Sequence, residues 1–341
     1  MLNGQALPPL ECAPPVKGDQ ARRLAAQLGL VPTRGFIIVV LNYRGLSDTV
    51  ECLASLHAIG IPVRSILVVD NGSPPTEAER ISAAHPGLPV LRLLSNVGYC
   101  GGNNAGCTIA QAAGATYVFA LNNDTTVEPG LVEALSTAGA EHPDAVLMTP
   151  KITWYHSPGT IWFGGGSYCP WLGYPTVHGR RQRDDGRFDR IRHITFATGC
   201  ALSIRLDRVK RIDTFVPELF AYAEDLELSL HVMRNGGTLL YVPHAVVRHK
   251  EGLAFEQAGG QPLRAFLSVR NLLLVARTYL RWYHWITAIP MFTVGYVARF
   301  AGVYAIRRDW DSLTALLRGC IAGLCTRLPA TLRGVRADRR T

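Results

Sequence analysis

Short apolar runs in the N-terminal part of the chain limit its fold more than any other feature. Phe36–Leu41, Ser65–Val69 and Tyr117–Leu121 are almost entirely apolar, and Val90–Leu94 is a shorter run of the same kind. Such runs are typical of strands buried on both faces. Between the first two, Ser47–Ile59 carries apolar residues on one helical face. Strands that alternate with helices predict an α/β fold with a doubly wound, mostly parallel sheet.

Three of these runs end in residues that can bind a ligand. The segments are Asn42–Gly45, Asp70–Ser73 and Asn122–Asp124. Ligands of open α/β sheets bind in the crevice outside the carboxyl ends of the strands. A carboxylate such as Asp70 can accept the imide N–H of a uracil or thymine ring, and the oxygens of Asn122–Asp124 suit Mg²⁺ or Mn²⁺. Asp70–Ser73 and Asn122–Asp124 are also good turn sequences, and that alternative stays open for both.

The segment Asn96–Gly106 is rich in glycine and asparagine. We expect a loop whose backbone N–H groups approach a phosphate or ribose, followed by a helix whose N-terminus favours an anion. The spacing does not match G-x-G-x-x-G, which disfavours a dinucleotide-binding fold. An ordinary tight connection is the alternative.

An acidic pair, Glu224 and Asp225, opens the helix predicted over Ala223–Arg234. The helix dipole favours acidic residues in a first turn, so the pair needs no function. Aromatic residues precede it from Phe220 on, however, and would place it beside an aromatic cleft. There a carboxylate can act as general base on a hydroxyl group.

Two histidines, His244 and His249, follow the strand predicted over Thr238–Val242. A neutral imidazole is a good metal ligand, and His249 is the candidate. No thiolate cluster or H-E-x-x-H sequence accompanies the pair, which argues against structural zinc. For either histidine alone, hydrogen bonding in the core or to solvent is the alternative.

Between and beyond these motifs the chain changes character. Residues 154–192 show little periodicity and predict irregular functional loops, whereas Phe196–Ile204 resembles a strand with a glycine kink. Pro262–Ile306 is helical, aromatic and basic. Its most apolar stretch, Trp285–Val297, has 13 residues and contains Pro290, whereas a spanning helix needs about 20. We expect this stretch to lie in a membrane interface; a core helix pair that covers the sheet is the alternative.

The chain has a formal net charge of +9, and eight Arg face three Asp over residues 307–341. Such an excess favours nucleotide diphosphates, acidic lipid head groups or nucleic acid as partners. Nucleic acid is disfavoured, because the chain shows neither a basic recognition helix nor aromatics interleaved with basic residues.

The eight cysteines form no C-x-x-C pair, which is typical of a reduced, cytosolic chain. Residues 1–16 contain four prolines and no basic segment ahead of an apolar stretch, so they do not resemble a signal peptide. We expect residues 1–34 to be a flexible lead-in with one short helix over Gln20–Gly29.

Taken in order, these motifs resemble the family 2 glycosyltransferases over about residues 36–275, and most of all their rhamnosyltransferase-like branch. The resemblance also rests on Ala197–Leu202, which reads Ala-Thr-Gly-Cys-Ala-Leu. It implies a GT-A fold and inversion at the anomeric carbon. The implied donor is a nucleotide sugar, dTDP-rhamnose or similar, and the implied acceptor is a hydroxyl of a glycan or lipid-linked glycan. A divalent cation, Mn²⁺ or Mg²⁺, is the implied cofactor.

The same resemblance implies roles for individual residues. Asp124 is the main metal ligand, with Asn122 and His249 beside it, and Asp225 is the general base with Glu224 as a neighbouring contact. The residues expected to bind the donor are Asn42, Arg44, Asp70, Asn71, Asn96, Gly98, Asn103 and Asn123. One departure matters: the family's Asp-x-Asp reads Asn122-Asn-Asp124 here, which removes one negative charge from the metal site.

These expectations divide the chain into three parts. Residues 35–260 form the catalytic domain, with a nucleotide-binding half at 35–127 and an acceptor half at 128–260. Residues 261–341 form a helical, basic region in peripheral contact with the inner face of the cytoplasmic membrane, as suits polysaccharide biosynthesis for the cell envelope. A non-catalytic protein that binds nucleotide sugars or glycans on the same scaffold is the main alternative. A nucleotidyltransferase is less favoured, because its phosphate loop would be richer in Lys or Arg.

Overall fold

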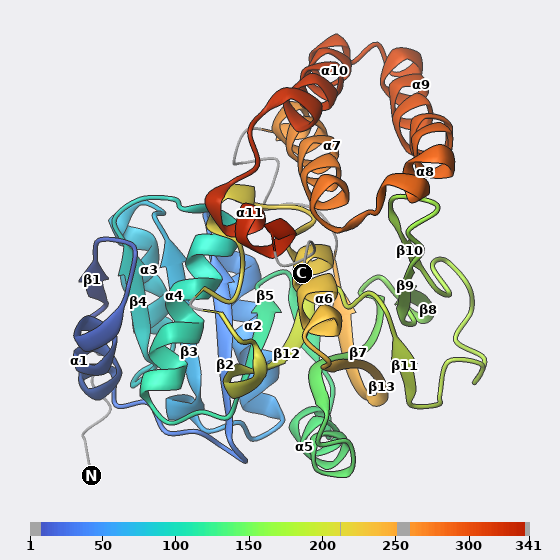
Figure 1. Ribbon diagram of the computed structural model, residues 1–341. Helices are drawn as coiled ribbons and strands as arrows, with labels where there is room; N and C mark the ends of the chain where they lie inside the picture. The colour runs from blue at the N-terminus through green and yellow to red at the C-terminus, as the bar shows by residue number, and fades with distance from the viewer. Residues whose placement is uncertain (1–7, 212, 251–259, 338–341) are drawn as a thin grey trace.

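The computed structural model describes residues 8–211, 213–250 and 260–337, and a mixed sheet of 11 strands forms the centre of this part (Figure 1). Along the sheet the strands lie in the order β1 (Leu10–Cys12), β4 (Val90–Leu93), β3 (Ile66–Asn71), β2 (Phe36–Asn42), β5 (Tyr117–Asn122), β12 (Ala201–Arg205), β7 (Ala145–Trp154), β13 (Thr238–His249) and β11 (Arg192–Ile194). Two more strands join off this path, since β6 (Thr125–Val127) pairs with β13 and β8 (Ser157–Phe163) pairs with β7.

The N-terminal half of the sheet is parallel, as the apolar runs predict. β2 pairs with β3 and β5, and the register sets Asn42 opposite Asp70 and Leu41 opposite Asn122. The polar strand ends therefore meet at one edge. Helices α2 (Leu46–Ala58), α3 (Pro75–Ala84), α4 (Gly98–Ala112) and α5 (Leu131–Glu141) make the connections between strands, so the predicted doubly wound α/β arrangement is confirmed.

Antiparallel strands complete the sheet and bring distant residues to the same edge. β12 lies antiparallel between β5 and β7, with Ala201 opposite Leu121. At the end of β13, His249 lies opposite Thr125 of β6. This pairing sets the late histidine beside the Asn122–Asp124 turn. β13 is longer than predicted, because it continues through an irregularity between Val242 and Val246.

Helix α4 corrects the prediction of a long phosphate-binding loop over Asn96–Gly106. The helix already begins at Gly98, so most of that segment is helical. The glycines let the helix approach the sheet closely. A Cβ at Gly102 would lie 2.4 Å from Cδ1 of Leu41, and one at Gly106 would lie 2.5 Å from Cγ1 of Val39. Tertiary packing, and not loop flexibility, explains these glycines.

Three further segments differ from expectation. Residues 154–192 contain β8 and a small antiparallel pair, β9 (Gly166–Tyr168) with β10 (Pro175–Val177), because the glycines there serve turns between short strands. The strand predicted over Phe196–Ile204 begins only at Ala201. The short helix expected over Gln20–Gly29 is confirmed as α1 (Gly18–Leu28), but the lead-in is not flexible in its described part, because α1 buries apolar side chains and β1 pairs with β4.

The C-terminal region is helical, as predicted, and most of it projects from the sheet domain, whereas its last helix lies back against that domain (Figure 1). It comprises α7 (Gly260–Tyr279), α8 (Trp285–Phe292), α9 (Arg299–Ile306), α10 (Trp310–Cys325) and α11 (Ala330–Ala337). α7 is largely buried and packs against α10. α8 and α9 belong to one continuous helix over Trp282–Ile306, which we call the apolar helix.

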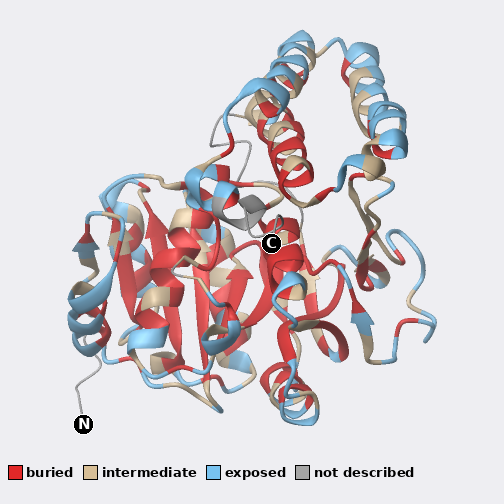
Figure 2. Cartoon of the chain, in the orientation of Figure 1, coloured by how far each residue is buried: buried red, intermediate tan, exposed pale blue. Residues whose placement is uncertain are grey.

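The apolar helix is longer and more exposed than expected. It has 25 residues and is the one helix in the described residues that is long and apolar enough to span a membrane, judged by length and composition alone. Pro290 lies inside it without ending it. Much of it is exposed (Figure 2); Trp282 is 80% exposed and Val294 70%. The alternative of a core helix pair over the sheet is therefore wrong for this helix.

Candidate active site

A cavity of about 290 Å³ opens at the edge of the sheet where the strand ends meet. Its wall includes nine of the residues selected from the sequence: Asn71, Asn96, Gly98, Asn122, Asn123, Asp124, Glu224, Asp225 and His249. The structure thus brings together residues that are more than 170 positions apart in the chain. Asn42, Arg44, Asp70 and Asn103 do not line this cavity.

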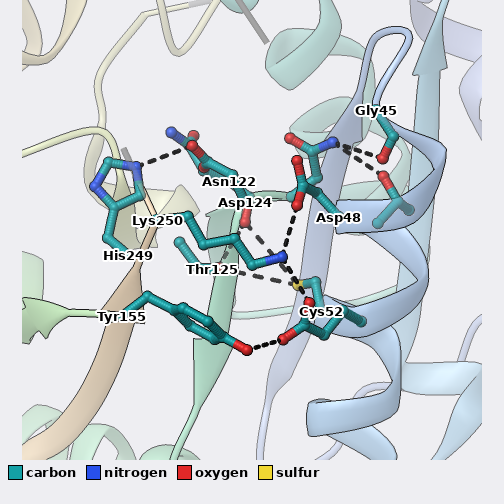
Figure 3. Close-up of polar contacts among 12 residues, drawn as sticks. Gly45, Asp48, Cys52, Asn122, Asp124, Thr125, Tyr155, His249 and Lys250 are labelled. Carbon is teal, nitrogen blue, oxygen red and sulfur yellow. Dashed lines mark hydrogen bonds and ion pairs between the residues drawn. The ribbon is translucent and has the colours of Figure 1, made fainter. Parts of the chain in front are cut away.

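Asp124 and His249 face each other on one side of the cavity (Figure 3). Nε2 of His249 lies 3.2 Å from Oδ2 of Asp124, and both side chains are buried. The ring of Trp162 packs edge-on against the His249 ring at 4.6 Å. Burial acts to lower the pKa of His249, but its contacts with Cys200 and the Asp124 carboxylate outweigh burial and raise that pKa well above its usual range.

With His249 neutral, these two residues offer the donor atoms for a divalent cation with few protein ligands. A carboxylate oxygen and an imidazole nitrogen meet at the cavity wall, with Asn122 on the same wall. Among the described residues no group of three or more His, Cys, Asp and Glu side chains is arranged so that it could hold a metal ion by itself. Mg²⁺ and Mn²⁺ are often bound by one or two side chains together with waters and substrate phosphates.

Glu224 and Asp225 lie at the same cavity, at the start of α6 (Glu224–Arg234). Oδ2 of Asp225 accepts a hydrogen bond from the Gly199 amide at 3.0 Å, which fixes the carboxylate. Burial raises the pKa of Asp225 above its ordinary value. Burial and the nearby Asp225 charge raise the pKa of Glu224 well above its own usual value. The pair is therefore able to hold a proton beside a carboxylate.

Asn71 and Asn96 shape the cavity near the start of α4. Nδ2 of Asn71 donates to Oδ1 of Asn96 and to the Gly98 carbonyl, both at 3.0 Å. Oδ1 of Asn96 also accepts the Gly98 amide hydrogen at 2.8 Å. Asn103, by contrast, is buried inside α4, and its amide donates to the Tyr99 carbonyl. Its interactions are those of a structural residue.

Asn42 and Asp70 lie together, but behind the cavity wall. Nδ2 of Asn42 donates to Oδ1 of Asp70 at 2.8 Å and to Oε1 of Glu77 at 3.0 Å. Both residues are fully buried, and burial raises the pKa of Asp70. Arg44 is exposed, with its guanidinium over the Tyr43 ring. A role for these residues in donor binding stays a prediction.

Asn123 lines the cavity, but its amide is directed at α2. Nδ2 donates to Oγ1 of Thr49 at 3.0 Å and lies 3.4 Å from Oδ1 of Asn42. These bonds tie the Asn122–Asp124 turn to the end of β2 and the start of α2. Asn123 therefore positions Asp124, whatever else it contacts.

The model of glycosyl transferase family 2 matches residues 36–205, the segment from β2 to β12 that forms most of this cavity. The chain belongs to glycosyl transferase family 2. It is a glycosyltransferase that uses a nucleotide sugar, which overturns the alternative of a non-catalytic binding protein.

Relatives agree with this membership. The chain is 26% identical over 235 residues to the N-acetylglucosaminyl-diphospho-decaprenol L-rhamnosyltransferase of Mycobacterium tuberculosis (strain CDC 1551 / Oshkosh), which covers 62% of this chain and 75% of the relative. The predicted rhamnosyltransferase-like branch is confirmed.

Solved structures show the GT-A fold. GalNAc-T7 with UDP, GalNAc and Mn²⁺ superposes with a TM-score of 0.58 at 16% identity; the match covers 89% of this chain and 54% of that one. S. aureus TarS 1-349 in complex with UDP-GlcNAc gives 0.54 at 14% identity, covering 88% and 83%. The predicted fold class is therefore confirmed.

Lys250 is a residue of this glycosyltransferase that the sequence did not single out. Its backbone N–H donates to the Asp124 carbonyl at 3.0 Å. Its ammonium lies 2.6 Å from carboxylate oxygens of both Asp48 and Glu51 on α2 (Figure 3). The lysine thus ties the end of β13 to the first half of the domain. Its position next to His249 in sequence was the available signal.

A strained loop precedes the acidic pair of the transferase. Phe220, Tyr222 and Ala223 have φ values of +65°, +69° and +60°, a conformation that costs free energy in residues other than glycine. The side chain of Asn271 on α7 holds this loop. Its Nδ2 lies 2.8 Å from the carbonyl oxygens of Leu219, Ala221 and Tyr222. No local sequence pattern marks Asn271, because its partners lie about 50 positions away.

Proposed function

We propose that this glycosyltransferase transfers a sugar from dTDP-rhamnose, or a similar nucleotide sugar, to a hydroxyl group of a lipid-linked glycan with inversion at the anomeric carbon. One observation carries the proposal: Asp124 with His249 and Asp225 with Glu224 line one cavity. The name of the M. tuberculosis relative supports both the sugar and the diphospho-polyprenol acceptor.

On the donor side, Asp124, His249 and Asn122 would hold the divalent cation. When bound, Mn²⁺ or Mg²⁺ supplies positive charge that stabilises the diphosphate leaving group, which contributes several kcal/mol. Asn123 and Lys250 keep the Asp124 turn in place through their bonds to α2 and to the Asp124 carbonyl. Asn71, Asn96 and Gly98 form the wall that faces the rest of the donor.

On the acceptor side, Asp225 takes the proton of the attacking hydroxyl. The new bond from the acceptor oxygen to C1 forms as the bond from C1 to the phosphate oxygen breaks, and the nucleoside diphosphate leaves with that bonding pair. The Gly199 amide orients the carboxylate. Its raised pKa makes it a stronger base than an exposed aspartate.

The Asp225→Asn variant tests this assignment. We expect donor binding to be unchanged and transfer to fall about 10²–10⁴-fold, the usual contribution of a general base. The donor is first chosen by thermal shift against a panel of nucleotide sugars, with and without Mn²⁺. Asp311→Asn, at an exposed position of α10, is the matched control. Near-normal turnover by Asp225→Asn would contradict the role of base.

The apolar helix also supports peripheral contact with the inner face of the cytoplasmic membrane. Its exposed Ile286 and Val294 present an apolar surface, and basic residues follow it at Arg307 and Arg308. The variant Ile286→Glu with Val294→Glu should move the protein from the membrane fraction to the soluble fraction. Retention of this variant in the membrane fraction would rule out contact through this surface.

A further inference from the structure

A second hollow, of about 310 Å³, lies beside the catalytic cavity and shares Tyr222 and Asp225 with it. Its other walls come from β10, α7 and the apolar helix, and they include Tyr174, Tyr296 and Arg299. A molecule in this hollow can therefore reach the carboxylate of Asp225. The hollow is thus adjacent to the acceptor side of the catalytic cavity.

A third hollow, of about 490 Å³, is almost wholly apolar. It lies along the seam between α7 and the apolar helix, with a third wall from α10. Leu272 and Tyr296 line the second hollow, whereas their neighbours Leu273 and Val297 line the third. The two hollows thus flank the same seam. Arg277 is the one charged residue among those lining the third hollow, and its guanidinium is bonded to the Gly323 and Thr326 carbonyls.

Two arginines lie between the catalytic cavity and the seam. Arg264 lines the catalytic cavity with its guanidinium 5.8 Å from the centre of the Tyr222 ring, and Arg299 lines the second hollow. Asp225 is the one acidic residue in the described lining of that hollow. The order along the surface is therefore base, cations, then apolar hollow. Guanidinium groups bind phosphate oxygens well.

We propose that the second and third hollows bind the acceptor as a polyprenyl diphosphate, with its diphosphate at Arg299 and Arg264 and its hydrocarbon chain in the apolar hollow. This inference rests on the proposed function, and it adds the acceptor's binding site. The chemical order of such an acceptor, from sugar hydroxyl through diphosphate to hydrocarbon, matches the order of base, cations and apolar hollow.

The inward face of the apolar helix distinguishes this site from contact with a bilayer. Ala288 and Phe292 are buried and line the third hollow, whereas Ile286 and Val294 point outward and are exposed. The helix therefore has an outward apolar face suited to a membrane surface and an inward apolar face suited to one hydrocarbon chain. Because the inward face ends at the seam beside Asp225, we assign it to the acceptor and not to membrane lipid.

The test measures binding to the full-length protein by calorimetry, without lipid vesicles. The probes are farnesyl diphosphate and inorganic diphosphate, each added in the presence of a saturating nucleoside diphosphate that occupies the donor site. Farnesyl diphosphate should bind at least about 100-fold more tightly than inorganic diphosphate, since burial of each methylene group favours binding. Equal affinities, or displacement of farnesyl diphosphate by the nucleoside diphosphate, would overturn the proposal.

Two pairs of variants separate the head group from the chain. Arg299→Gln should weaken both probes about 10-fold through loss of a charged hydrogen bond, whereas Arg307→Gln, beyond the hollow, should weaken neither. Cys320→Trp fills the third hollow and should abolish the preference for farnesyl diphosphate. Ile321→Trp adds the same side chain at the next position, which is 64% exposed, and should leave the preference intact.

Melting temperatures check that each variant is folded. If Cys320→Trp does not fold, Ala288→Leu is a second variant that fills the third hollow. A preference for farnesyl diphosphate that survives filling of the hollow, or that appears only when vesicles are added, would overturn the proposal. Donor binding should be the same in all variants. Correct farnesyl diphosphate binding without any sugar transfer by the unmodified protein would contradict the proposed function and leave the binding site standing.

Discussion

The two sides of the catalytic cavity are held in place by different means. On the donor side, Asp124 and His249 are set by strand pairing, because His249 and Thr125 lie opposite each other in the β13–β6 ladder. On the acceptor side, Glu224 and Asp225 follow a left-handed loop, and the Asn271 side chain bonds three of its carbonyls. Many backbone hydrogen bonds share the load in the first case. In the second case side chains of α7 supply much of the support, and Asn271 alone contacts three carbonyls of the loop, so one substitution can loosen this side.

The largest expected effect tests the donor side. Asp124→Asn removes the carboxylate of the proposed metal site but keeps its shape, so transfer should fall about 10³-fold through loss of metal-assisted charge stabilisation. A titration of kcat/KM with Mn²⁺ measures this loss, and high Mn²⁺ should restore part of it. Asp48→Asn, which bonds Lys250 outside the cavity, should lose much less. Equal losses in the two variants would contradict the role of Asp124.

The acceptor side should respond to Asn271→Ala. The variant removes the amide that donates to the carbonyls of Leu219, Ala221 and Tyr222, which costs about 1–3 kcal/mol of stability. We expect kcat to fall about 10–100-fold, because small misplacements of a catalytic group have effects of that order, while KM for the donor stays constant. Asn271→Asp, of equal size but without N–H groups, should be at least as damaging. A variant with lower stability and normal kcat would make Asn271 purely structural.

The pH dependence sharpens the same contrast. Asp225 acts as a base only when ionised, and burial raises its pKa above the ordinary aspartate value. The acidic limb of kcat/KM should therefore lie at higher pH than for an exposed aspartate, whose pKa is about 3.9, and fall about tenfold per pH unit below it. Donor affinity at a fixed metal concentration should not follow that limb. A limb at or below the ordinary aspartate value would contradict the effect of burial.

The smallest effects are expected from two glycine substitutions, one in the tightly packed helix α4 on the donor side and one in the exposed apolar helix. Gly102→Ala places a Cβ against Leu41 and should destabilise the protein by about 1–3 kcal/mol. At Gly302 a Cβ meets nothing within 4 Å, so Gly302→Ala should stabilise its helix by about 0.5–1 kcal/mol. Chemical denaturation measures both. Opposite signs are the expected result, and equal signs would contradict the close packing of α4.

The sequence predicted the sheet and its polar edge because buried parallel strands carry a strong local signal. Phe36–Leu41 and Tyr117–Leu121 need no partner to be recognised as strands, and the residues that follow them meet at one edge through the register. The early start of α4 was not predictable in this way. Glycine and asparagine are weak helix formers, and only the contact of the helix with β2 explains their presence.

The features of the site that the sequence did not predict depend mostly on contacts between distant segments. The sequence separates Asn271 from Tyr222 and Lys250 from Asp48, and nothing in either neighbourhood marks the partner. The sequence also did not predict that Asp70 is buried behind the cavity wall, because a carboxylate at the end of a strand is usually accessible to a ligand. The apolar helix is longer than the 13-residue apolar stretch because it also includes the polar and basic residues that flank that stretch, such as His284 and Arg299.

Helix α7 has one more consequence. Asn271 at its middle holds the loop before Asp225, and two residues later Leu273 begins the wall of the apolar hollow. Because a helix moves as a stiff body, a ligand that fixes the position of α7 at the hollow also fixes the loop that Asn271 bonds. Under the proposed acceptor site, a correctly seated hydrocarbon chain raises the rate of the chemical step. Acceptors with shortened chains then lose turnover as well as affinity, and the transferase senses its substrate's anchor far from the sugar that reacts.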